Sequence, residues 1–333
     1  MNIVQGRRNI LSIDCQDRFL REPFRIANEE HFDVTTLTVT IESNGAIGRG
    51  ECNPFSISGW SHKRALGEIE SVLPLIEHGI GRLALLNAME PGPARNAVDC
   101  ALFDLECAEL GLGAGDLLGV KATAPIKSAQ TAGLSENGEI LDFRSFINLP
   151  IIKLKIDRTS DTELVSKLRE AAPSARIIVD ANGSLDAAAV EHWLPVLKKN
   201  AVEVFEQPMA SGEDSYLRVV DQGNVALCAD ESFQSIKDLA TITGVYDMVN
   251  VKLDKVGGIT AASQSIQLAQ KMSLRVMVGC MMGSSLSAAP AWWLSHNAEV
   301  VDIDGPTLLS VDVDNSMSWK AGLVSQPTPK LWG

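Results

Sequence analysis

The feature that most constrains the fold is a repeat in the second half of the chain. From about residue 124, short apolar runs recur, and each run ends in a polar residue and is followed by a longer stretch with a helical pattern. Successive run ends lie 22 to 28 residues apart, which is the length of one strand plus one helix. The run ends are Thr131, Lys155, Asp180, Glu206, Asp230, Lys252, Cys280 and Asp302.

Apolar strands that alternate with helices indicate a parallel sheet that is buried on both faces. Eight regular units predict closure into an α/β fold of the (β/α)8-type barrel over residues 121–311. An open doubly wound sheet is less favoured, because no Gly-x-Gly-x-x-Gly follows a strand. In such a barrel the active site lies at the C-terminal ends of the strands, where the polar residues are.

Residues 1–120 have a different pattern and predict a small α+β domain. Residues 35–52 alternate polar and apolar side chains around Asn44 and Gly45, which indicates an antiparallel hairpin. Residues 92–110 have apolar positions three and four apart, as in an amphipathic helix. Strands followed by helices are typical of an α+β unit.

Composition argues against several classes of partner. A net charge of -13 makes nucleic acid or an anionic membrane unsuitable as the main partner. No apolar run approaches the roughly 18 residues needed to span a bilayer, and the N-terminus has no apolar signal segment. We therefore expect a soluble, cytoplasmic protein. The six cysteines lack metal-ligand spacing and should be free thiols.

Two lysines end opposite strands of the predicted barrel. Strands two and six are diametrically opposed in an eight-stranded ring, so Lys155 and Lys252 should face each other across its mouth. Asp180, Glu206 and Asp230 end the strands between them, and three close carboxylates repel unless a hard cation joins them. We expect one Mg²⁺ per active site; zinc is less suitable, because no His or Cys joins the cluster.

The lysines could transfer protons. Lys153 lies two residues from Lys155, so the charge of each, and a nearby metal, should lower the pKa of the other. Lys155 could then remove a proton from the carbon next to a carboxylate, and Lys252 could return one on the opposite face. Mg²⁺ would stabilise the enediolate that forms. The outcome would be racemisation or epimerisation by 1,1-proton transfer.

Each of these residues, taken alone, has a simpler explanation. An aspartate at a strand end is commonly the cap of the next helix, and a lysine there is commonly a solvated charge. Five such residues on five consecutive units are hard to explain by capping. By strand alternation, Glu231 should point away from its neighbour Asp230. Asp312 and Asp314 should belong to a tail strand without a role.

Five motifs in this order resemble the muconate-lactonizing branch of the enolase superfamily: KLK, VDAN, EQP, ADES and NVKLDKVGG. PFRIA and GEC extend the resemblance over nearly the whole chain. It implies a modified TIM barrel under a capping domain, residues 1–120, that the tail, residues 312–333, joins. It also implies the roles of five residues: metal ligands Asp180, Glu206 and Asp230, and acid/base residues Lys155 and Lys252. Lys153, two residues from Lys155, is expected to support it.

The segment VVDIDGP, residues 300–306, resembles the dipeptide epimerases, especially the L-Ala-D/L-Glu epimerases of peptidoglycan recycling. Asp302 and Asp304 point to the same side of a strand, and two buried like charges need a positive partner. The resemblance implies that this partner is the α-ammonium of a dipeptide. The other expected substrate contacts are Thr131, Cys280, Met282, Ser284 and Ser285.

The loop after Phe24 leaves the second residue of the dipeptide open. Family members selective for glutamate tend to carry an arginine there, whereas this chain has Glu29 and Glu30, with Arg25 earlier. If the glutamates face the pocket, they would repel a glutamyl side chain and favour Lys or Arg. Arg25 and Glu29 are therefore candidate contacts. L-Ala-D/L-Glu is the leading substrate, with cationic and hydrophobic dipeptides as alternatives.

Two other functions fit part of the pattern. An o-succinylbenzoate synthase or a muconate cycloisomerase-like lyase would use the metal and the lysines, but it has no use for the pair Asp302 and Asp304. A catalytically silent binding protein would not need opposed bases. The resemblance also suggests a homo-oligomer.

Overall fold

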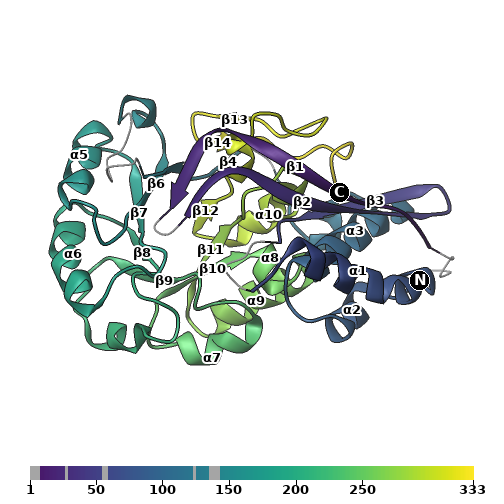
Figure 1. Ribbon diagram of the computed structural model, residues 1–333, viewed down its shortest axis with the longest axis horizontal. Helices are drawn as coiled ribbons and strands as arrows, with labels where there is room; N and C mark the ends of the chain where they lie inside the picture. Colours follow the sequence, from purple (N-terminus) through teal and green to yellow (C-terminus); the bar gives the residue numbers. More distant parts are fainter. Residues whose placement is uncertain (1–7, 27–28, 55–58, 123–124, 135–142) are drawn as a thin grey trace.

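The computed structural model describes residues 8–26, 29–54, 59–122, 125–134 and 143–333. It contains a three-stranded antiparallel sheet near the N-terminus and an eight-stranded parallel sheet in the second half of the chain (Figure 1). The predicted fold class, a (β/α)8-type barrel with an α+β N-terminal part, is confirmed. No helix in these residues is long and apolar enough to cross a membrane.

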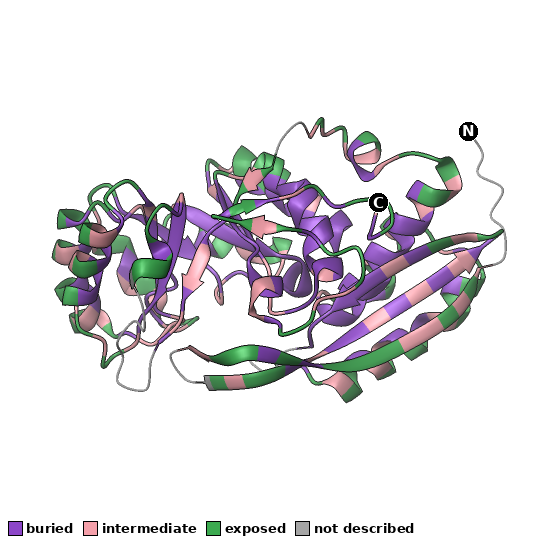
Figure 2. Cartoon of the chain, turned by 90° about the horizontal axis from the view of Figure 1, so that it is seen from above, coloured by how far each residue is buried: buried purple, intermediate pink, exposed green. Residues whose placement is uncertain are grey.

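The antiparallel sheet forms the predicted hairpin. Asn44 and Gly45 make its turn with φ values of 52° and 85°, which asparagine and glycine tolerate best. Leu37, Val39 and Ile41 alternate along one strand and are buried, whereas Thr38, Thr40 and Glu42 are partly exposed. Figure 2 shows buried and more exposed positions alternating along strands of this sheet. The strands, in spatial order, are β1 (Asn9–Ile26), β2 (Glu29–Ser43) and β3 (Ala46–Cys52).

Helices cover the buried face of this sheet. A Cβ atom on Gly48 or Gly50 would lie only 2.1 or 2.2 Å from a backbone carbonyl oxygen, of Ala101 and Ala97 respectively. Glycine at both positions therefore lets β3 approach α3 closely. The helices of this region are α1 (His62–Glu77), α2 (Arg82–Ala88), α3 (Pro93–Leu110) and α4 (Ala114–Leu118).

The parallel strands follow one another in chain order around the barrel. β12 and β5 are not paired as strands, but Ala129 N–H donates to the Val301 carbonyl at 2.7 Å, so the barrel is nearly closed. The strands are β5 (Gln130–Ala132), β6 (Ile151–Lys155), β7 (Arg176–Asp180), β8 (Val204–Glu206), β9 (Ala226–Ala229), β10 (Met248–Lys252), β11 (Arg275–Gly279) and β12 (Val300–Asp302).

The helices around the barrel are less regular than the repeat predicts. The connection from β8 to β9 contains only the 3₁₀ turn Asp214–Val219, where the spacing predicts a longer helix. The α-helices are α5 (Glu163–Ala171), α6 (Ala187–Lys199), α7 (Leu239–Ile242), α8 (Leu253–Val256), α9 (Ile259–Lys271) and α10 (Ser285–Leu294). Further 3₁₀ turns are Phe143–Phe146, Ile236–Asp238, Ser295–Asn297 and Gly305–Leu308.

The positions of the apolar residues inside the barrel show which residues of each strand point toward its mouth. One apolar layer takes a buried residue from, or directly before, each strand: Ala129, Ile151, Ile178, Val204, Cys228, Met248, Met277 and Val300. Side chains two residues further along a strand point to the same side. Lys153, Asp180, Glu206 and Asp302 therefore form the next layer, and all four are buried.

The C-terminal tail returns to the N-terminal part. The Trp332 ring stacks on Phe103 of α3 with centroids 5.2 Å apart, and Gly333 N–H donates to Asp104 Oδ1. These contacts join the tail to the region expected as the capping domain. The tail also pairs with a strand near the start of the barrel. This small sheet contains β13 (Trp319–Lys320), β14 (Leu323–Val324) and β4 (Ile126–Lys127).

A buried acid connects α3 to the barrel and makes stability depend on pH. Asp99 Oδ2 accepts a hydrogen bond from Thr260 N–H at 2.8 Å, at the start of α9. Its other oxygen is buried without a hydrogen-bond partner. Burial raises the pKa of Asp99 from 3.8 to about 6. The protonated carboxyl therefore stabilises the fold below about pH 4, and this stabilisation is lost as the pH rises through 6.

We expect Asp99→Asn to remove this loss, because the amide keeps an acceptor for Thr260 N–H and cannot ionise. Chemical denaturation of both proteins at pH 5 and pH 8 measures the effect. The free energy of unfolding of the variant, relative to the parent, should be higher at pH 8 than at pH 5 by about 1 kcal/mol. Parallel pH profiles of the two proteins would contradict the assignment.

Candidate active site

A cavity of about 410 Å³ lies at the mouth of the barrel. The β1–β2 hairpin reaches over this mouth, as Figure 1 shows, and Leu134 N–H donates to the Arg25 carbonyl there. The N-terminal region supplies Phe24, Ile26, Asn53 and Trp60 to the cavity wall. The barrel supplies Lys155, Asn182, Asp230, Glu231, Lys252, Asp254, Cys280, Met281 and Met282, among others.

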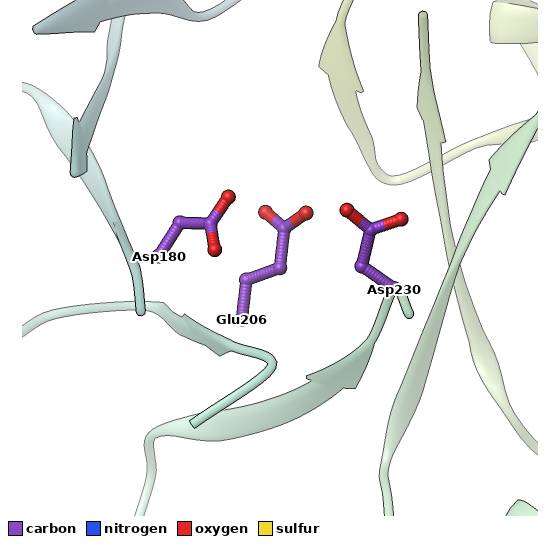
Figure 3. A group of neighbouring side chains, drawn as sticks. All are labelled: Asp180, Glu206 and Asp230. Carbon is purple, nitrogen blue, oxygen red and sulfur yellow. The ribbon is translucent and has the colours of Figure 1, made fainter. Parts of the chain in front are cut away.

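Three carboxylates from neighbouring strands meet at the bottom of the mouth. Asp180 ends β7, Glu206 ends β8, and Asp230 follows β9, and one oxygen of each lies within 4.8 Å of the others. All three are buried, and Figure 3 shows their carboxylate groups pointing into the same space. Oxygen ligands at this spacing suit a hard cation such as Mg²⁺.

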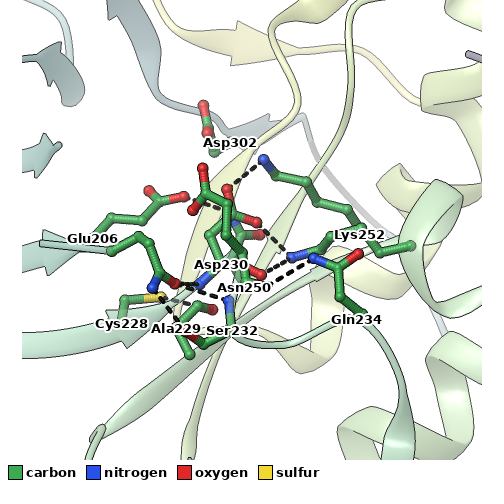
Figure 4. Close-up of polar contacts among 12 residues, drawn as sticks. Glu206, Cys228, Ala229, Asp230, Ser232, Gln234, Asn250, Lys252 and Asp302 are labelled. Atoms are coloured by element: carbon green, nitrogen blue, oxygen red, sulfur yellow. Dashed lines mark hydrogen bonds and ion pairs between the residues drawn. The ribbon is translucent and has the colours of Figure 1, made fainter. Parts of the chain in front are cut away.

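Ammonium groups lie on these carboxylates. Lys153 Nζ is 3.0 Å from Asp180 Oδ2 and 2.8 Å from Glu206 Oε2. Lys155 Nζ is 2.6 Å from Asp180 Oδ2. Lys252 Nζ is 2.6 Å from Asp230 Oδ2, a contact that Figure 4 shows. Each of the three carboxylates is therefore paired with at least one lysine. Glu206 Oε2 is buried, and among the described residues its ion pair with Lys153 is its only polar contact.

The carboxylates differ in their affinity for protons. Burial and the neighbouring Asp180 raise the pKa of Glu206 to about 8. Burial alone would also raise the pKa of Asp180, but Lys153 and Lys155 lower it to about 2. The same competition, with Lys252 and Lys255 as the cations, lowers the pKa of Asp230. Glu206, between Asp180 and Asp230, thus has the least compensation from lysines of the three carboxyl groups.

The expectation that its neighbour Lys155 lowers the pKa of Lys153 is wrong. Burial disfavours the charged form of Lys153, but Asp180, Asp302 and Glu206 together raise its pKa well above the ordinary value. Asp230 likewise raises the pKa of Lys252. The carboxylates outweigh the like charges because they make direct contact at 2.6 to 3.0 Å.

Two residues that the sequence analysis did not select hold Asp230 in place. Lys255 Nζ contacts Asp230 Oδ1 at 2.5 Å and the Asp230 carbonyl at 2.6 Å. Gln207 Oε1 accepts the Asp230 N–H at 2.8 Å and that of Ser232 at 3.0 Å. Gln207 is buried and has a φ of 35°, so its backbone is held in a conformation unusual for glutamine. Both residues lie within motifs that carry the family resemblance, Gln207 in EQP and Lys255 in NVKLDKVGG, and this was the signal that could have identified them.

Asp302 ends β12 and contacts the cluster, whereas Asp304 lies two residues past the strand, so the prediction that both share one side of a strand does not hold for Asp304. Asp302 Oδ2 pairs with Lys153 Nζ at 2.8 Å, and its other oxygen is buried without a hydrogen bond. Asp304 Oδ2 accepts the backbone N–H of Thr131 at 2.6 Å. Burial and Asp302 raise the pKa of Asp304 to about 7. The positive group that contacts Asp302 is thus Lys153 of this chain. Thr131 donates its backbone N–H to Asp304, and a contact between Thr131 and a substrate stays a prediction.

The segment after β11 divides into two parts. Cys280, Met281 and Met282 line the cavity. Ser284 instead donates its hydroxyl to Glu51 Oε2 at 2.8 Å, and Ser285 hydrogen-bonds Asp312 through its N–H and its hydroxyl.

Ser284 and Ser285 are fully buried, so the structure does not place their hydroxyls toward a substrate. They fix the start of α10, because Ser284 also accepts the Leu286 N–H. Glu51 pairs with Arg18 at 2.9 Å, which links α10 to the N-terminal sheet. Asp312, expected to have no role, has one here: it holds the start of α10 from the tail.

The hairpin residues expected near the second residue of a dipeptide are only partly described. Arg25 pairs with Glu30 at 3.0 Å across the β1–β2 ladder, and both are partly exposed. The cavity is lined by Phe24 and Ile26, which alternate with Arg25 along β1. Glu29 begins β2, but its side chain lies outside the described part of the structure. An acidic loop facing the pocket therefore gains no support from Glu30.

Glu231 is on the cavity wall, contrary to the prediction from strand alternation. β9 ends at Ala229, so the alternation no longer applies at Glu231. Its Oε1 accepts a hydrogen bond from Asn182 Nδ2 at 3.0 Å. Asp254 is a second unselected acid of this wall; burial raises its pKa to about 7, and Asn96 of α3 donates to it at 2.9 Å.

Comparison with known proteins points to one family. Residues 144–324 match the Enolase C-terminal domain-like family. The chain is 33% identical over 306 residues to the L-Ala-D/L-Glu epimerase of Escherichia coli (strain K12), a match that covers 91% of this chain and 95% of that protein. It is 36% identical over 250 residues to the N-acetyl-D-glutamate racemase of a Pseudoalteromonas species, covering 75% and 79%.

A solved structure has the same fold throughout. It is an enolase family member from Agrobacterium tumefaciens, described as having homology to dipeptide epimerases, with bound sodium and L-Ala-L-Glu. Its sequence is 34% identical, the TM-score is 0.93, and the match covers 98% of this chain and all of that one.

Proposed function

This chain belongs to the Enolase C-terminal domain-like family of the enolase superfamily, and we propose that it is a dipeptide epimerase that inverts the α-carbon of the second residue of a dipeptide by two-base 1,1-proton transfer. The observation that carries the proposal is the placement of the two lysines. Lys155 forms an ion pair with Asp180, at one end of the acidic cluster. Lys252 forms an ion pair with Asp230, at the other end. Both line the same cavity.

Asp180, Glu206 and Asp230 would hold one Mg²⁺ in this proposal. The donor set supports it, because the three carboxylates are buried and one oxygen of each lies within 4.8 Å of the others. When bound, Mg²⁺ supplies positive charge next to the substrate carboxylate and so favours loss of the α-proton.

The lysines carry the proton in each direction. One lysine, as the free amine, takes the α-proton, and the electron pair of the C–H bond moves into the adjacent carboxyl group. The opposite lysine, as the ammonium, then gives a proton to the other face of the same carbon, so the configuration inverts. Starting from the opposite epimer, Lys155 and Lys252 exchange roles. No atom is gained or lost by the substrate.

Asp302 and Asp304 would bind the α-ammonium of the dipeptide. Asp302 has one buried oxygen without a hydrogen bond, which a further donor would satisfy. L-Ala-D/L-Glu is the leading substrate, supported by the similarity to the Escherichia coli enzyme. A cationic second residue loses part of its support, because Glu30 is paired with Arg25.

A second candidate substrate is an N-acylated glutamate. The similarity to N-acetyl-D-glutamate racemase favours it, and so does one contact: Asp302 is already paired with Lys153, so an ammonium is not required to neutralise it. The proton transfer would be the same, and only recognition of the first residue would differ.

Two substrates that differ only in the ammonium separate these candidates. N-propionyl-L-Glu has the carbon skeleton of L-Ala-L-Glu without the amino group. The parent enzyme should show a kcat/KM about 10²-fold higher for the dipeptide, because an ammonium bound to a buried carboxylate forms a charge-assisted hydrogen bond. Asp302→Asn should remove most of this preference, mainly by raising KM for L-Ala-L-Glu. A parent enzyme that prefers N-propionyl-L-Glu would contradict dipeptide recognition and favour the N-acyl substrate.

A further inference from the structure

A short chain of side chains leads from Glu231 to Lys155. Glu231 Oε1 accepts a hydrogen bond from Asn182 Nδ2 at 3.0 Å. Asn182 Oδ1 in turn accepts one from Lys155 Nζ at 3.0 Å. All three residues line the cavity, and neither contact involves the oxygen atoms of Asp230.

The contact to Glu231 decides which way the Asn182 amide faces. A carboxylate oxygen accepts hydrogen bonds and cannot donate them, so it selects the NH₂ group of the amide. The amide oxygen is then turned toward Lys155. With the amide reversed, a carboxylate oxygen would face a carbonyl oxygen, and an ammonium would face an NH₂ group, so both contacts would be repulsive.

The backbone of Asn182 is held in place independently of its side chain. Its φ of 43° lies in the left-handed region, which asparagine and glycine adopt more readily than other residues. Its N–H donates to Asp180 Oδ1 at 2.9 Å. Glycine at this position would keep both the φ value and this hydrogen bond, so the side chain can be removed without disturbing Asp180.

We propose that Asn182 and Glu231 are positioning residues that aim the Lys155 amino group at the substrate. Lys155 Nζ has two fixed acceptors, Asp180 Oδ2 at 2.6 Å and Asn182 Oδ1 at 3.0 Å. A neutral amine has two N–H groups and one lone pair, so two acceptors leave the lone pair directed away from both, toward the cavity. This inference rests on the proposed role of Lys155 as one of the two bases.

The consequence is confined to one face of the substrate. Lys252 Nζ is held by Asp230 Oδ2, and among the described contacts it has no hydrogen bond to Asn182 or Glu231. The Glu231 carboxylate acts on Lys252 only through its charge, without direct contact, and Asn182→Gly leaves that charge in place. Loss of the positioning pair should therefore impair proton transfer by Lys155 and spare transfer by Lys252.

The test follows exchange of the α-proton in D₂O, separately for L-Ala-L-Glu and L-Ala-D-Glu, with Mg²⁺ present. In Asn182→Gly and Glu231→Leu, exchange should slow about 10²-fold for the epimer that Lys155 deprotonates. Lys155→Ala identifies that epimer. Exchange from the other epimer should stay within a few-fold of the parent. Glu231→Gln is the matched variant: it keeps an oxygen acceptor for Asn182 but can also donate to it, so exchange from the Lys155 epimer should slow by less than in Glu231→Leu, while exchange from the other epimer stays within a few-fold of the parent.

Other outcomes are distinguishable. Equal slowing of both epimers, or weaker Mg²⁺ binding by calorimetry in Asn182→Gly, would overturn the inference and assign a structural role beside Asp180. An unchanged rate in both Asn182→Gly and Glu231→Leu would also overturn it. No exchange by the parent enzyme would refute the proposed function, and this inference with it.

Discussion

Replacement of either Lys155 or Lys252 by alanine is expected to lower kcat/KM for epimerisation by at least about 10³-fold. Each lysine is needed for every inversion, because one removes the α-proton and the other returns a proton on the opposite face. A water molecule cannot replace either one efficiently, since both lysine residues are buried, each less than a tenth exposed, and both are held in place by an ion pair with a carboxylate. Polarimetry or chiral chromatography of L-Ala-L-Glu reaction mixtures measures the loss.

These variants should still fold. Removal of Lys155 leaves Asp180 paired with Lys153, and removal of Lys252 leaves Asp230 paired with Lys255. Neither change therefore leaves a buried carboxylate without a cation, which would be the costly outcome. Circular dichroism and Mg²⁺ titration are the controls. Inversion at the parent rate in either alanine variant, with folding intact, would rule out the two-base mechanism.

Removal of divalent metal is expected to abolish turnover, with a loss of at least about 10³-fold that Mg²⁺ restores. Without the metal, Lys155 and Lys252 remain paired with Asp180 and Asp230, and nothing favours the negative charge that develops next to the substrate carboxylate. The experiment is dialysis against a chelator, an assay, and back-titration with Mg²⁺.

The metal-free protein should remain folded, because lysines already compensate the charge of the cluster. Glu206→Gln provides a second measure: it keeps an acceptor for Asn250 Nδ2, which donates to Glu206 Oε1 at 2.8 Å, but it removes one negative charge. Mg²⁺ binding by calorimetry should weaken by at least about 10-fold. Full activity in the presence of excess chelator, or unchanged Mg²⁺ binding in this variant, would show that the cluster is not a metal site.

The barrel and the centre of its site could be predicted because both follow from strand periodicity. Residues two apart on a strand share a side, so apolar positions such as Ile178 and Val204 also fix where Asp180 and Glu206 point. The order of the units then places Lys155 and Lys252 on strands two and six. No long-range packing information was needed for these positions.

Positions outside the strands could not be predicted in this way. Glu231 lies just after the end of β9, where the chain bends and alternation no longer gives a direction. Ser284 and Ser285 are near the mouth in sequence, but their partners are Glu51 and Asp312. Such contacts join segments more than 25 residues apart, and they depend on how the tail and the N-terminal sheet pack on the barrel.

The hairpin illustrates a further limit. Two consecutive glutamates predict local negative charge, but the ladder places Arg25 directly opposite Glu30 and pairs them. The register of β1 and β2 includes a shift between Phe19 and Phe24, which the pattern of residues does not reveal. The charge of the loop toward the substrate therefore cannot be deduced from its sequence.

The most direct test of the central claim is proton NMR of L-Ala-L-Glu incubated with the enzyme and Mg²⁺ in D₂O. The two-base account predicts loss of the α-proton signal of the glutamyl residue together with appearance of L-Ala-D-Glu, while the alanyl α-proton keeps its intensity. Exchange without inversion would leave one lysine without a role, and no exchange at all would contradict epimerase chemistry on this dipeptide.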